Sequence, residues 1–340
     1  MRKFKVGITQ DFFVEAKGRF EAALQHKLAP LPYVEFESMP AQKIATPDVI
    51  DQYDAIFALA VKFNRESLQG IKRLALIARW GVGYDMIDTA ALTDADAALA
   101  ITPNAVRRPV AEAILTLIFA LSKNLFIQDR LVREGKWRGD LPSLGGCLEG
   151  KTLGSVGCGN IAKEMFRLSG SLGFGRFIAY DPFATPTPGV ELVSLEEVMR
   201  ASDFVAVNTL LNADTHHMIR EEQFRMMKPT AYFINTARGP IVDQAALTKA
   251  LREHWIAGAG IDVFEQEPVA KDDPLLQLDN VILAPHGLAW TQEIARDNGL
   301  EACDNIIAIS KGEVPLSVVN REVLTRPGFQ AKLAAFRASH

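Results

Sequence analysis

The sequence predicts an α/β protein with two parallel sheets, each at the centre of a doubly wound domain. Its 340 residues exceed what one hydrophobic core usually serves, so we expect two domains. Short apolar runs of strand length alternate with helical patterns, which favours parallel sheets. The alternation occurs twice, before and after the glycine-rich stretch SLGGCLEGK at 143–151.

The first set of elements fills the amino-terminal third of the chain. Its expected strands are FKVGIT (4–9), AIFALA (55–60), LALIAR (74–79) and ALAIT (98–102). Between the first two lies VEAKGRFEAALQHKL (14–28), which has a helical pattern. The stretch 110–124 is apolar nearly all round, which is typical of a helix buried between layers or domains.

The second set predicts a sheet of six strands, the number that a doubly wound dinucleotide-binding domain requires. These strands are expected at 152–157, 176–181, 203–208, 231–236, 257–262 and 280–285. After them, residues 291–311 have a helical pattern and should return the chain to the first domain. Residues 312–340 are expected to form a loop and a short basic amphipathic tail, with its charges solvated.

Composition excludes several classes of function. A formal net charge of −4 does not indicate binding to nucleic acid or to an anionic membrane, both of which favour an excess of basic residues. No apolar run reaches the roughly 18 residues of a membrane span, and the amino terminus lacks a signal-type apolar run. The three cysteines, at unrelated spacings, suggest neither a disulfide framework nor a zinc site, so a reducing cytoplasm is expected.

A glycine turn between a strand and a helix predicts a dinucleotide site. Gly157, Gly159 and Ala162 match the pattern G-x-G-x-x-G/A, which allows a tight turn, close approach of a pyrophosphate and close helix packing. Glycine turns open many helices, so the pattern alone is weak evidence. Asp181 ends the next strand, where a carboxylate binds ribose hydroxyls and repels a 2′-phosphate; otherwise it is a loop aspartate before Pro182. We therefore expect NAD rather than NADP.

Three reactive side chains follow successive strands of this second sheet. Arg238 suits a substrate carboxylate, Glu267 lies in an acidic loop after a glycine-rich strand, and His286 ends the strand after that. Each has a plainer interpretation, as a surface arginine, a solvated acid or a loop histidine. Because the carboxyl ends of parallel strands share one edge, topology alone can bring the three together.

The chain resembles the NAD-dependent D-2-hydroxyacid dehydrogenase family over about residues 50 to 320. The resemblance is densest in GKTLGSVGCGNIA, MKPTAYFINTARGPIVDQAALTKAL and IAGAGIDVFEQEP, followed by Pro285-His286. It implies that Arg238 is the catalytic arginine, Glu267 the glutamate and His286 the acid/base. It also implies a Rossmann domain at 102–287, inserted into a discontinuous, flavodoxin-like substrate domain at 1–101 and 288–340.

The same resemblance implies further contacts. Substrate carboxylate would meet the N–H groups of Val82 and Gly83, in GVGYDMID, and VAEAILTLIFAL would contribute to a homodimer interface. Asp262 and the Ala237 carbonyl would hold the nicotinamide amide. The implied cofactor-binding residues are Gly157, Gly159, Asn160, Ile161, Asp181, Asn208, Thr209, Thr215, Ala237, Asp262 and His286.

The chain departs from the family pattern around the expected substrate. Met86, Asn208 and Leu210 replace asparagine, histidine and proline, Leu59 and Ala60 stand where some members carry a basic residue, and GLAWTQE follows His286. We hypothesise that Trp290 and Leu59 contact the substituent on C3 of the substrate, with Arg107 or Arg108 available for an extra anionic or hydroxyl group. Trp290 is equally well interpreted as an anchor between domains. The adjacent His216 and His217 lack partners for a metal site, so no metal is expected.

The expected reaction is hydride transfer between NAD(H) and a small 2-oxo or D-2-hydroxy acid. His286 would exchange the proton, Glu267 beside it would favour the imidazolium, and Arg238 would orient the carboxylate. Formate oxidation is disfavoured, because family members with that activity carry glutamine in place of Glu267. Two alternatives stay open, a phosphite-type dehydrogenase with the same three residues and an NAD-sensing corepressor without enzymatic activity.

Overall fold

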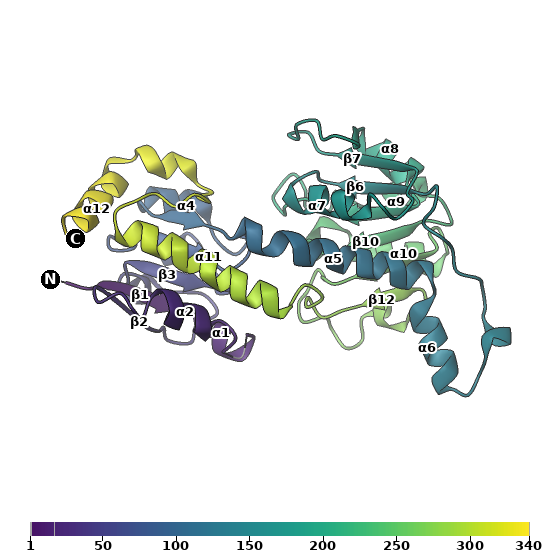
Figure 1. The fold of residues 1–340 in the computed structure, drawn as a ribbon, viewed down its shortest axis with the longest axis horizontal. Helices are drawn as coiled ribbons and strands as arrows, with labels where there is room; N and C mark the ends of the chain where they lie inside the picture. Colours follow the sequence, from purple (N-terminus) through teal and green to yellow (C-terminus); the bar gives the residue numbers. More distant parts are fainter. Residues whose placement is uncertain (1, 17, 340) are drawn as a thin grey trace. The chain divides into compact units, whose positions relative to one another are not determined.

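The computed structural model describes residues 2–16 and 18–339, which form two compact units. Unit 1 holds the chain up to Val106 and again from Trp290 onward, and unit 2 holds Arg107–Ala289. Each unit contains a parallel sheet flanked by helices, which confirms the predicted fold class (Figure 1). The first boundary lies inside a long helix, where sequence analysis placed it before that helix.

Unit 1 is built on five parallel strands in the order β2-β1-β3-β4-β5. These are β1 Phe4–Ile8, β2 Val34–Ser38, β3 Ala55–Ala58, β4 Leu76–Arg79 and β5 Ala98–Ala100. This is the flavodoxin-like order. Strand β2 was missed by the sequence analysis, because VEFES alternates apolar and acidic residues at a half-exposed edge.

Helices cover the sheet of unit 1, and two of them overlap the helical pattern at 14–28. Helix α1 spans Asp11–Val14 and α2 spans Glu21–Lys27, so the helical pattern at 14–28 corresponds to α2 and the last residue of α1. Gly18 lies between them with φ +77, a left-handed conformation that a helix does not contain. Helix α11, Gln292–Ser310, packs against α2 on one side of the sheet (Figure 1).

The carboxyl-terminal tail is anchored to unit 1. After η5, Arg321–Thr325, helix α12 spans Pro327–Ala338 and buries Phe329 and Leu333. The expectation that its basic residues are all solvated was wrong for Lys332, whose Nζ donates hydrogen bonds to the carbonyls of Leu74, Ala95 and Asp96 at 2.7, 3.1 and 2.9 Å. Burial of this amine lowers the pKa of Lys332 to about 8.

Unit 2 is built on seven parallel strands in the order β12-β11-β10-β9-β6-β7-β8. They are β6 Thr152–Val156, β7 Arg176–Tyr180, β8 Glu191–Leu192, β9 Phe204–Val207, β10 Tyr232–Asn235, β11 Gly258–Ile261 and β12 Val281–Leu283. All six expected strands are present, and the two-residue β8 extends the sheet beyond them. The order reverses between β6 and β9, which is the Rossmann arrangement.

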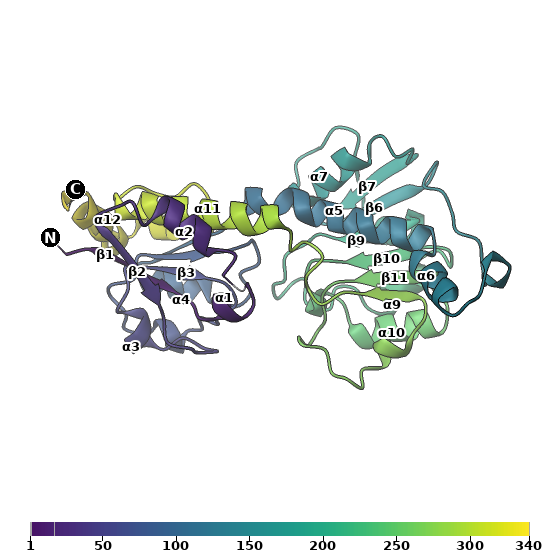
Figure 2. The ribbon, with the colours of Figure 1, turned by 60° about the horizontal axis from the view of Figure 1, so that its bottom comes forward.

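Helices cover both faces of the sheet of unit 2. Helix α5, Pro103–Ser122, crosses one face (Figure 2), and Leu117 packs directly on Gly260 of β11. The other helices of unit 2 are α6 Leu125–Arg133, η2 Arg138–Asp140, α7 Asn160–Ser169, α8 Leu195–Ala201, α9 Glu221–Met226, η3 Gly239–Ile241, α10 Gln244–Arg252 and η4 Pro274–Gln277. Those of unit 1 not yet named are α3 Pro47–Ile50, η1 Glu66–Leu68 and α4 Thr89–Asp94.

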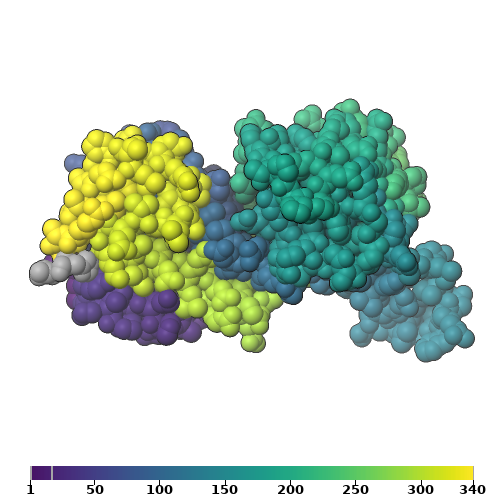
Figure 3. Space-filling view, turned by 45° about the horizontal axis from the view of Figure 1, so that its top comes forward, coloured from purple at the N-terminus to yellow at the C-terminus, as the bar shows by residue number. Residues whose placement is uncertain are grey.

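Helix α6 and the loop after it form an arm of residues 125–146 that stands out from unit 2 (Figure 3). The arm exposes large apolar side chains, including Phe126, Trp137 and Leu144. Among the described residues, no single helix is long and apolar enough to cross a membrane, although α5 and α6, bent by 59° at their junction, meet that criterion as a pair.

Candidate active site

The glycine turn after β6 has the geometry that a bound dinucleotide requires. Gly157 has φ +99, and a Cβ there would lie 2.6 Å from the backbone of Asn208, so only glycine fits. Gly159 precedes the first turn of α7, and no atom lies within 4 Å of where its Cβ would stand. The free N–H groups of that turn, which begins at Asn160 and Ile161, are therefore open to a phosphate group.

Asp181 follows β7 beside this turn. Its carboxylate accepts hydrogen bonds from the N–H groups of Cys158 and Phe183, both at 2.9 Å. Each carboxylate oxygen keeps a second lone pair, so the side chain can still accept ribose hydroxyls. Burial raises the pKa of the Cys158 thiol, which stays neutral inside the turn. These residues fit a dinucleotide, and the turn holds the aspartate in place.

The loop after β9 carries three expected cofactor residues with different local roles. The Asn208 amide donates to Ser155 Oγ at 2.9 Å, which ties the end of β9 to β6. Thr215 Oγ1 donates to the carbonyl of Leu210 at 2.6 Å and closes the loop on itself. Thr209 lies half-buried between them, next to the point where Gly157 packs.

His286 and Glu267 form a hydrogen-bonded pair at the carboxyl edge of this sheet. The distance from Nδ1 to Glu267 Oε2 is 2.8 Å, and the other carboxylate oxygen accepts the N–H of Phe264 at 3.0 Å. With Nδ1–H on the carboxylate, Nε2 is the nitrogen left for proton exchange. No described residue forms a hydrogen bond with Nε2.

The backbone at His286 is held in a left-handed conformation, with φ +51. Asp262, only 3% exposed, stabilises it by accepting the N–H of Gly287 at 2.9 Å and the N–H of Leu288 at 3.3 Å. Sequence analysis assigned Asp262 to the nicotinamide amide. In the structure the carboxylate fixes the turn that presents the histidine, a role that only the positions of the backbone N–H groups could reveal.

Two carboxyl groups near the histidine have pKa values displaced in opposite directions. Burial raises the pKa of Asp262 and outweighs the hydrogen bonds from Gly287 and Leu288. Burial also acts to raise the pKa of Glu267, but the hydrogen bond and charge of His286, the Phe264 N–H and the charge of Arg238 lower it overall. Glu267 is thus ionised beside the histidine at neutral pH.

Arg238 lies in the loop that follows β10, directly before η3. Its guanidinium donates to the carbonyl of Ala237 at 2.8 Å, and its own carbonyl accepts from the Asn235 amide at 3.0 Å. The next residue, Gly239, packs so tightly that a Cβ would lie 1.9 Å from the carbonyl carbon of Phe264. The arginine segment and the glutamate segment are therefore in direct backbone contact, and sequence analysis gave no sign of it.

In unit 1, the loop after β4 offers unpaired backbone donors. No described residue accepts a hydrogen bond from the N–H of Val82 or Gly83. The loop is fixed around them, since Gly81 N–H donates to Thr102 Oγ1 at 2.7 Å and Arg79 Nε donates to the Gly83 carbonyl at 2.9 Å. Fixed, unpaired N–H groups at the carboxyl edge of a parallel sheet suit a carboxylate.

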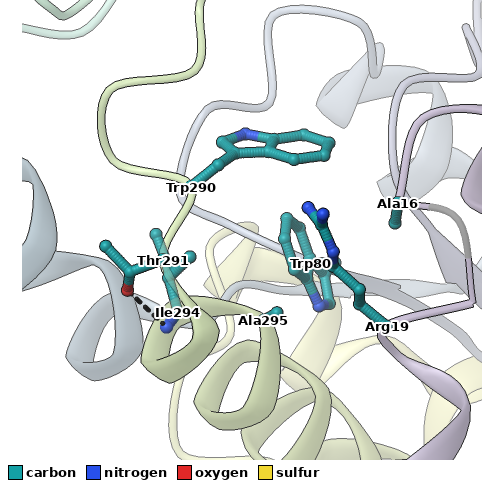
Figure 4. A pocket seen from close by; sticks show the side chains of 7 residues that line it. All are labelled: Ala16, Arg19, Trp80, Trp290, Thr291, Ile294 and Ala295. Carbon is teal, nitrogen blue, oxygen red and sulfur yellow. Dashed lines mark hydrogen bonds between the residues drawn. The ribbon is translucent and has the colours of Figure 1, made fainter.

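Beside this loop, Trp290 and Trp80 line a small pocket with Arg19 at its rim (Figure 4). The two indoles meet edge to face, with centroids 5.8 Å apart, and Ile294 adds a further apolar wall. Sequence analysis missed Trp80, which is buried at the end of β4. Leu59, only 6% exposed, packs in the hydrophobic core, so its side chain forms part of the support of this edge.

Two other expectations concern charged and metal-binding groups. Arg108 forms ion pairs within unit 2, a close one with Glu112 and one with Glu164 at 3.7 Å, and the hypothesis that Arg107 or Arg108 binds an extra group stays a prediction. Within the described part of the chain no group of three or more His, Cys, Asp or Glu side chains is placed to hold a metal ion.

A Rossmann sheet with an open glycine turn, and with a histidine–carboxylate pair at its carboxyl edge, defines a dinucleotide-dependent oxidoreductase. A family model described as D-isomer specific 2-hydroxyacid dehydrogenase, NAD binding domain, matches residues 115–287. The chain belongs to this family of D-2-hydroxyacid dehydrogenases, as the resemblance implied.

The chain is similar to known proteins over most of its length. It is 40% identical to the glyoxylate reductase of Korarchaeum cryptofilum over 303 residues, which cover 86% of this chain and 91% of the relative. A crystal structure of a glyoxylate reductase from Paecilomyes thermophila matches with a TM-score of 0.81 and 30% identity, covering 94% of this chain and 99% of that one. An NADPH-dependent glyoxylate/hydroxypyruvate reductase from Sinorhizobium meliloti, in complex with NADP and malonate, shares the fold with a TM-score of 0.81 at 24% identity, covering 95% of this chain and 98% of that one.

Proposed function

We propose that this dehydrogenase reduces 2-oxo acids to D-2-hydroxy acids with NADH, using His286 as the acid, Glu267 as its partner and Arg238 as the carboxylate ligand. The observation that carries the proposal is the 2.8 Å bond between His286 Nδ1 and Glu267 at the carboxyl edge of a dinucleotide-type sheet. A histidine held in this way by a carboxylate is suited to exchange protons through its second nitrogen.

In the reducing direction the hydride for C2 of the 2-oxo acid would come from a dinucleotide bound at the glycine turn of Gly157 and Gly159. His286 donates a proton from Nε2 to the carbonyl oxygen, and in the reverse direction the neutral imidazole removes it. Glu267, ionised because its pKa is lowered, stabilises the imidazolium before the transfer. Asp262 holds the turn that aims the ring. Acid–base assistance of this kind is worth about 10²–10⁴-fold in rate.

We propose the Arg238 guanidinium as a ligand of the substrate carboxylate, because it supplies a planar, charged fork. Within unit 1, the N–H groups of Val82 and Gly83 are fixed dipoles of the kind that bind a carboxylate. Arg238 gives up its bond to the Ala237 carbonyl when a carboxylate competes for it, because a charge-assisted hydrogen bond is the stronger one. The released carbonyl can then accept the nicotinamide amide, as the family resemblance implies.

We infer that NAD is preferred over NADP. Asp181 lies at the position that meets the adenosine ribose, and its negative charge repels a 2′-phosphate. The remaining proposed contacts are the first turn of α7, at Asn160 and Ile161, and the loop of Asn208, Thr209 and Thr215.

The side of the substrate away from the carboxylate is expected to be apolar. Relatives such as the one from Korarchaeum cryptofilum are glyoxylate reductases, whose substrate has no substituent on C2 beyond hydrogen. In this chain the indoles of Trp290 and Trp80 meet edge to face, and Leu59 packs in the core of the same unit. We propose that Trp290 favours 2-oxo acids with an apolar substituent on C3. If Trp290→Ala leaves the ranking of substrates unchanged, Trp290 has no such role.

We also propose a homodimer and a reducing, cytoplasmic compartment. Helix α5, which the resemblance assigned to the interface, is mostly buried within its own chain. Exposed apolar side chains that a second copy could cover lie on the arm at 125–146, where Trp137 is 68% exposed, and on α5 at Phe119. The three cysteines are free thiols, in line with the proposed compartment. Light scattering on the purified chain tests the dimer.

Oxidation of NADH, followed by its absorbance, tests the proposed reaction against glyoxylate, hydroxypyruvate, pyruvate and bulkier 2-oxo acids. We expect turnover with at least one of them, and weaker turnover with NADPH. Tight NADH binding without turnover of any 2-oxo acid would instead favour a sensor, and turnover only with phosphite would favour the other alternative.

A further inference from the structure

Three loops leave the carboxyl edge of the sheet in unit 2, after β9, β10 and β11. The second carries Arg238 and the third carries Glu267. His217, in the first loop, contacts the other two. This residue belongs to the pair His216-His217, which has no role in the proposed reaction and, among the described residues, lies in no group of three or more His, Cys, Asp or Glu side chains placed to hold a metal ion.

His217 is bonded through both its backbone and its ring. Its N–H donates to the carbonyl of Pro240 at 2.8 Å, two residues beyond Arg238. Its Nε2 lies 2.5 Å from Glu265 Oε1, two residues before Glu267. The backbone is left-handed there, with φ +49, which is unusual for a residue other than glycine. The surrounding contacts therefore hold His217 in a conformation that the chain alone does not favour.

The segments that His217 joins are rigidly connected to the reacting side chains. Glu265 N–H donates to Gln244 Oε1 at 3.1 Å, and the Gln244 side chain donates to Asp273 at 2.7 Å. Between Glu265 and Glu267 the chain turns back, so that Phe264 N–H bonds Glu267 Oε1. A displacement of Glu265 is thus passed to the carboxylate that holds His286.

The pair is too exposed to serve mainly as a source of stability. The side chains of His217 and Glu265 are 37% and 34% exposed. Ion pairs with this much contact with water contribute little to the free energy of unfolding. We therefore expect the pair of His217 and Glu265 to act on the geometry of the loops that it joins.

We propose that His217 and Glu265 are a positioning pair, which holds the Arg238 and Glu267 segments in register for proton transfer at His286. This inference rests on the proposed function. Neither residue touches a reacting atom in this account, and both act through Glu267. The chain therefore carries two histidine–glutamate pairs on one acidic loop, one for chemistry and one for alignment.

Two substitutions of His217 distinguish the effect of its bond to Glu265 from the effect of its backbone conformation. His217→Asn keeps a residue that tolerates positive φ but is too short to reach Glu265, whereas His217→Gln keeps an N–H donor at similar reach. We expect His217→Asn to lower kcat by about ten-fold or more with little change in the Kd for NADH, and His217→Gln to restore most of it. His216→Asn is the matched control, because His216 stacks on His217 at 4.1 Å and makes no bond to Glu265 in the described structure.

Two further readouts distinguish alignment from general damage. In His217→Asn the acid limb of the kcat profile should move to higher pH, since Glu267 loses part of the bonding that lowers its pKa. The other groups that face Glu267, namely His286, Arg238 and Asp262, are not substituted in this variant. In a Glu265→Ala background, His217→Asn should have no additional effect, because the partner is already absent.

The inference is overturned if His217→Asn keeps kcat within about two-fold, or if its loss of activity follows a loss of thermal stability that glutamine does not rescue. Nitrogen NMR of the His286 imidazole provides a measurement that does not depend on turnover. If the wild-type chain reduces no 2-oxo acid, the proposed function fails. The inference then stands or falls on whether His217→Asn changes the His286 signals while His216→Asn does not.

Discussion

Gly239 is the residue where the smallest change should disturb the candidate active site most. A methyl group there would lie 1.9 Å from the carbonyl carbon and oxygen of Phe264 and 2.4 Å from the amide nitrogen of Glu265. All these are backbone atoms, so no side chain can rotate away. To reach ordinary van der Waals contact the two segments must separate by about 1.5 Å. One segment carries Arg238 and the other carries Glu267.

We therefore predict that Gly239→Ala lowers kcat/KM by about 10²-fold, the cost of misplacing catalytic groups by roughly an ångström. Overpacking should also lower the free energy of unfolding by about 1–3 kcal/mol, which leaves the chain folded at moderate temperature. Steady-state NADH oxidation and thermal melts measure the two effects. Gly139→Ala is the control, because that glycine has no neighbour within 4 Å of its Cβ position. A Gly239→Ala enzyme with normal kcat/KM would refute the claim that these backbone contacts set the geometry.

Three further predictions follow from individual side chains. Arg238→Ala should raise KM for the 2-oxo acid by about 10–100-fold with a smaller effect on kcat, because a charged carboxylate ligand is lost; an unchanged KM would contradict this role. Asp181→Ser should shift the ratio of Kd values for NADPH and NADH toward NADPH by at least about ten-fold in fluorescence titrations, and an unchanged ratio would show that another residue selects the cofactor. Lys332 has its pKa lowered to about 8 from an ordinary 10.5, so the folded chain binds fewer protons than the unfolded chain between these values and is stabilised as pH rises. The free energy of unfolding of the wild type, relative to Lys332→Met, should accordingly increase by up to roughly 3 kcal/mol across that range, and a constant difference would rule this out.

Much of the fold could be predicted, because apolar strand runs at regular spacing carry the signal themselves. The misses have local causes. Strand β2 lies at an edge where acidic residues alternate with apolar ones, and β8 has only two residues. Between α1 and α2 lies Gly18, whose positive φ the surrounding helical pattern conceals.

The reacting side chains could be proposed from topology, since parallel strands end at one edge. The contacts that hold these side chains in place could not be predicted from topology. That Asp262 bonds the backbone after His286, and that Gly239 touches Phe264, depend on loop conformations that no periodic pattern encodes. The contact of His217 with Glu265 joins residues 48 positions apart, and only the folded chain brings them together.

The central claim is that His286 carries the proton, and His286→Asn tests it most directly. Asparagine tolerates the left-handed backbone at this position, where φ is +51, so the turn held by Asp262 should persist. We predict that kcat for reduction of the best 2-oxo acid falls by about 10²–10⁴-fold. Unaltered turnover in this variant would contradict the assignment and the reaction built on it.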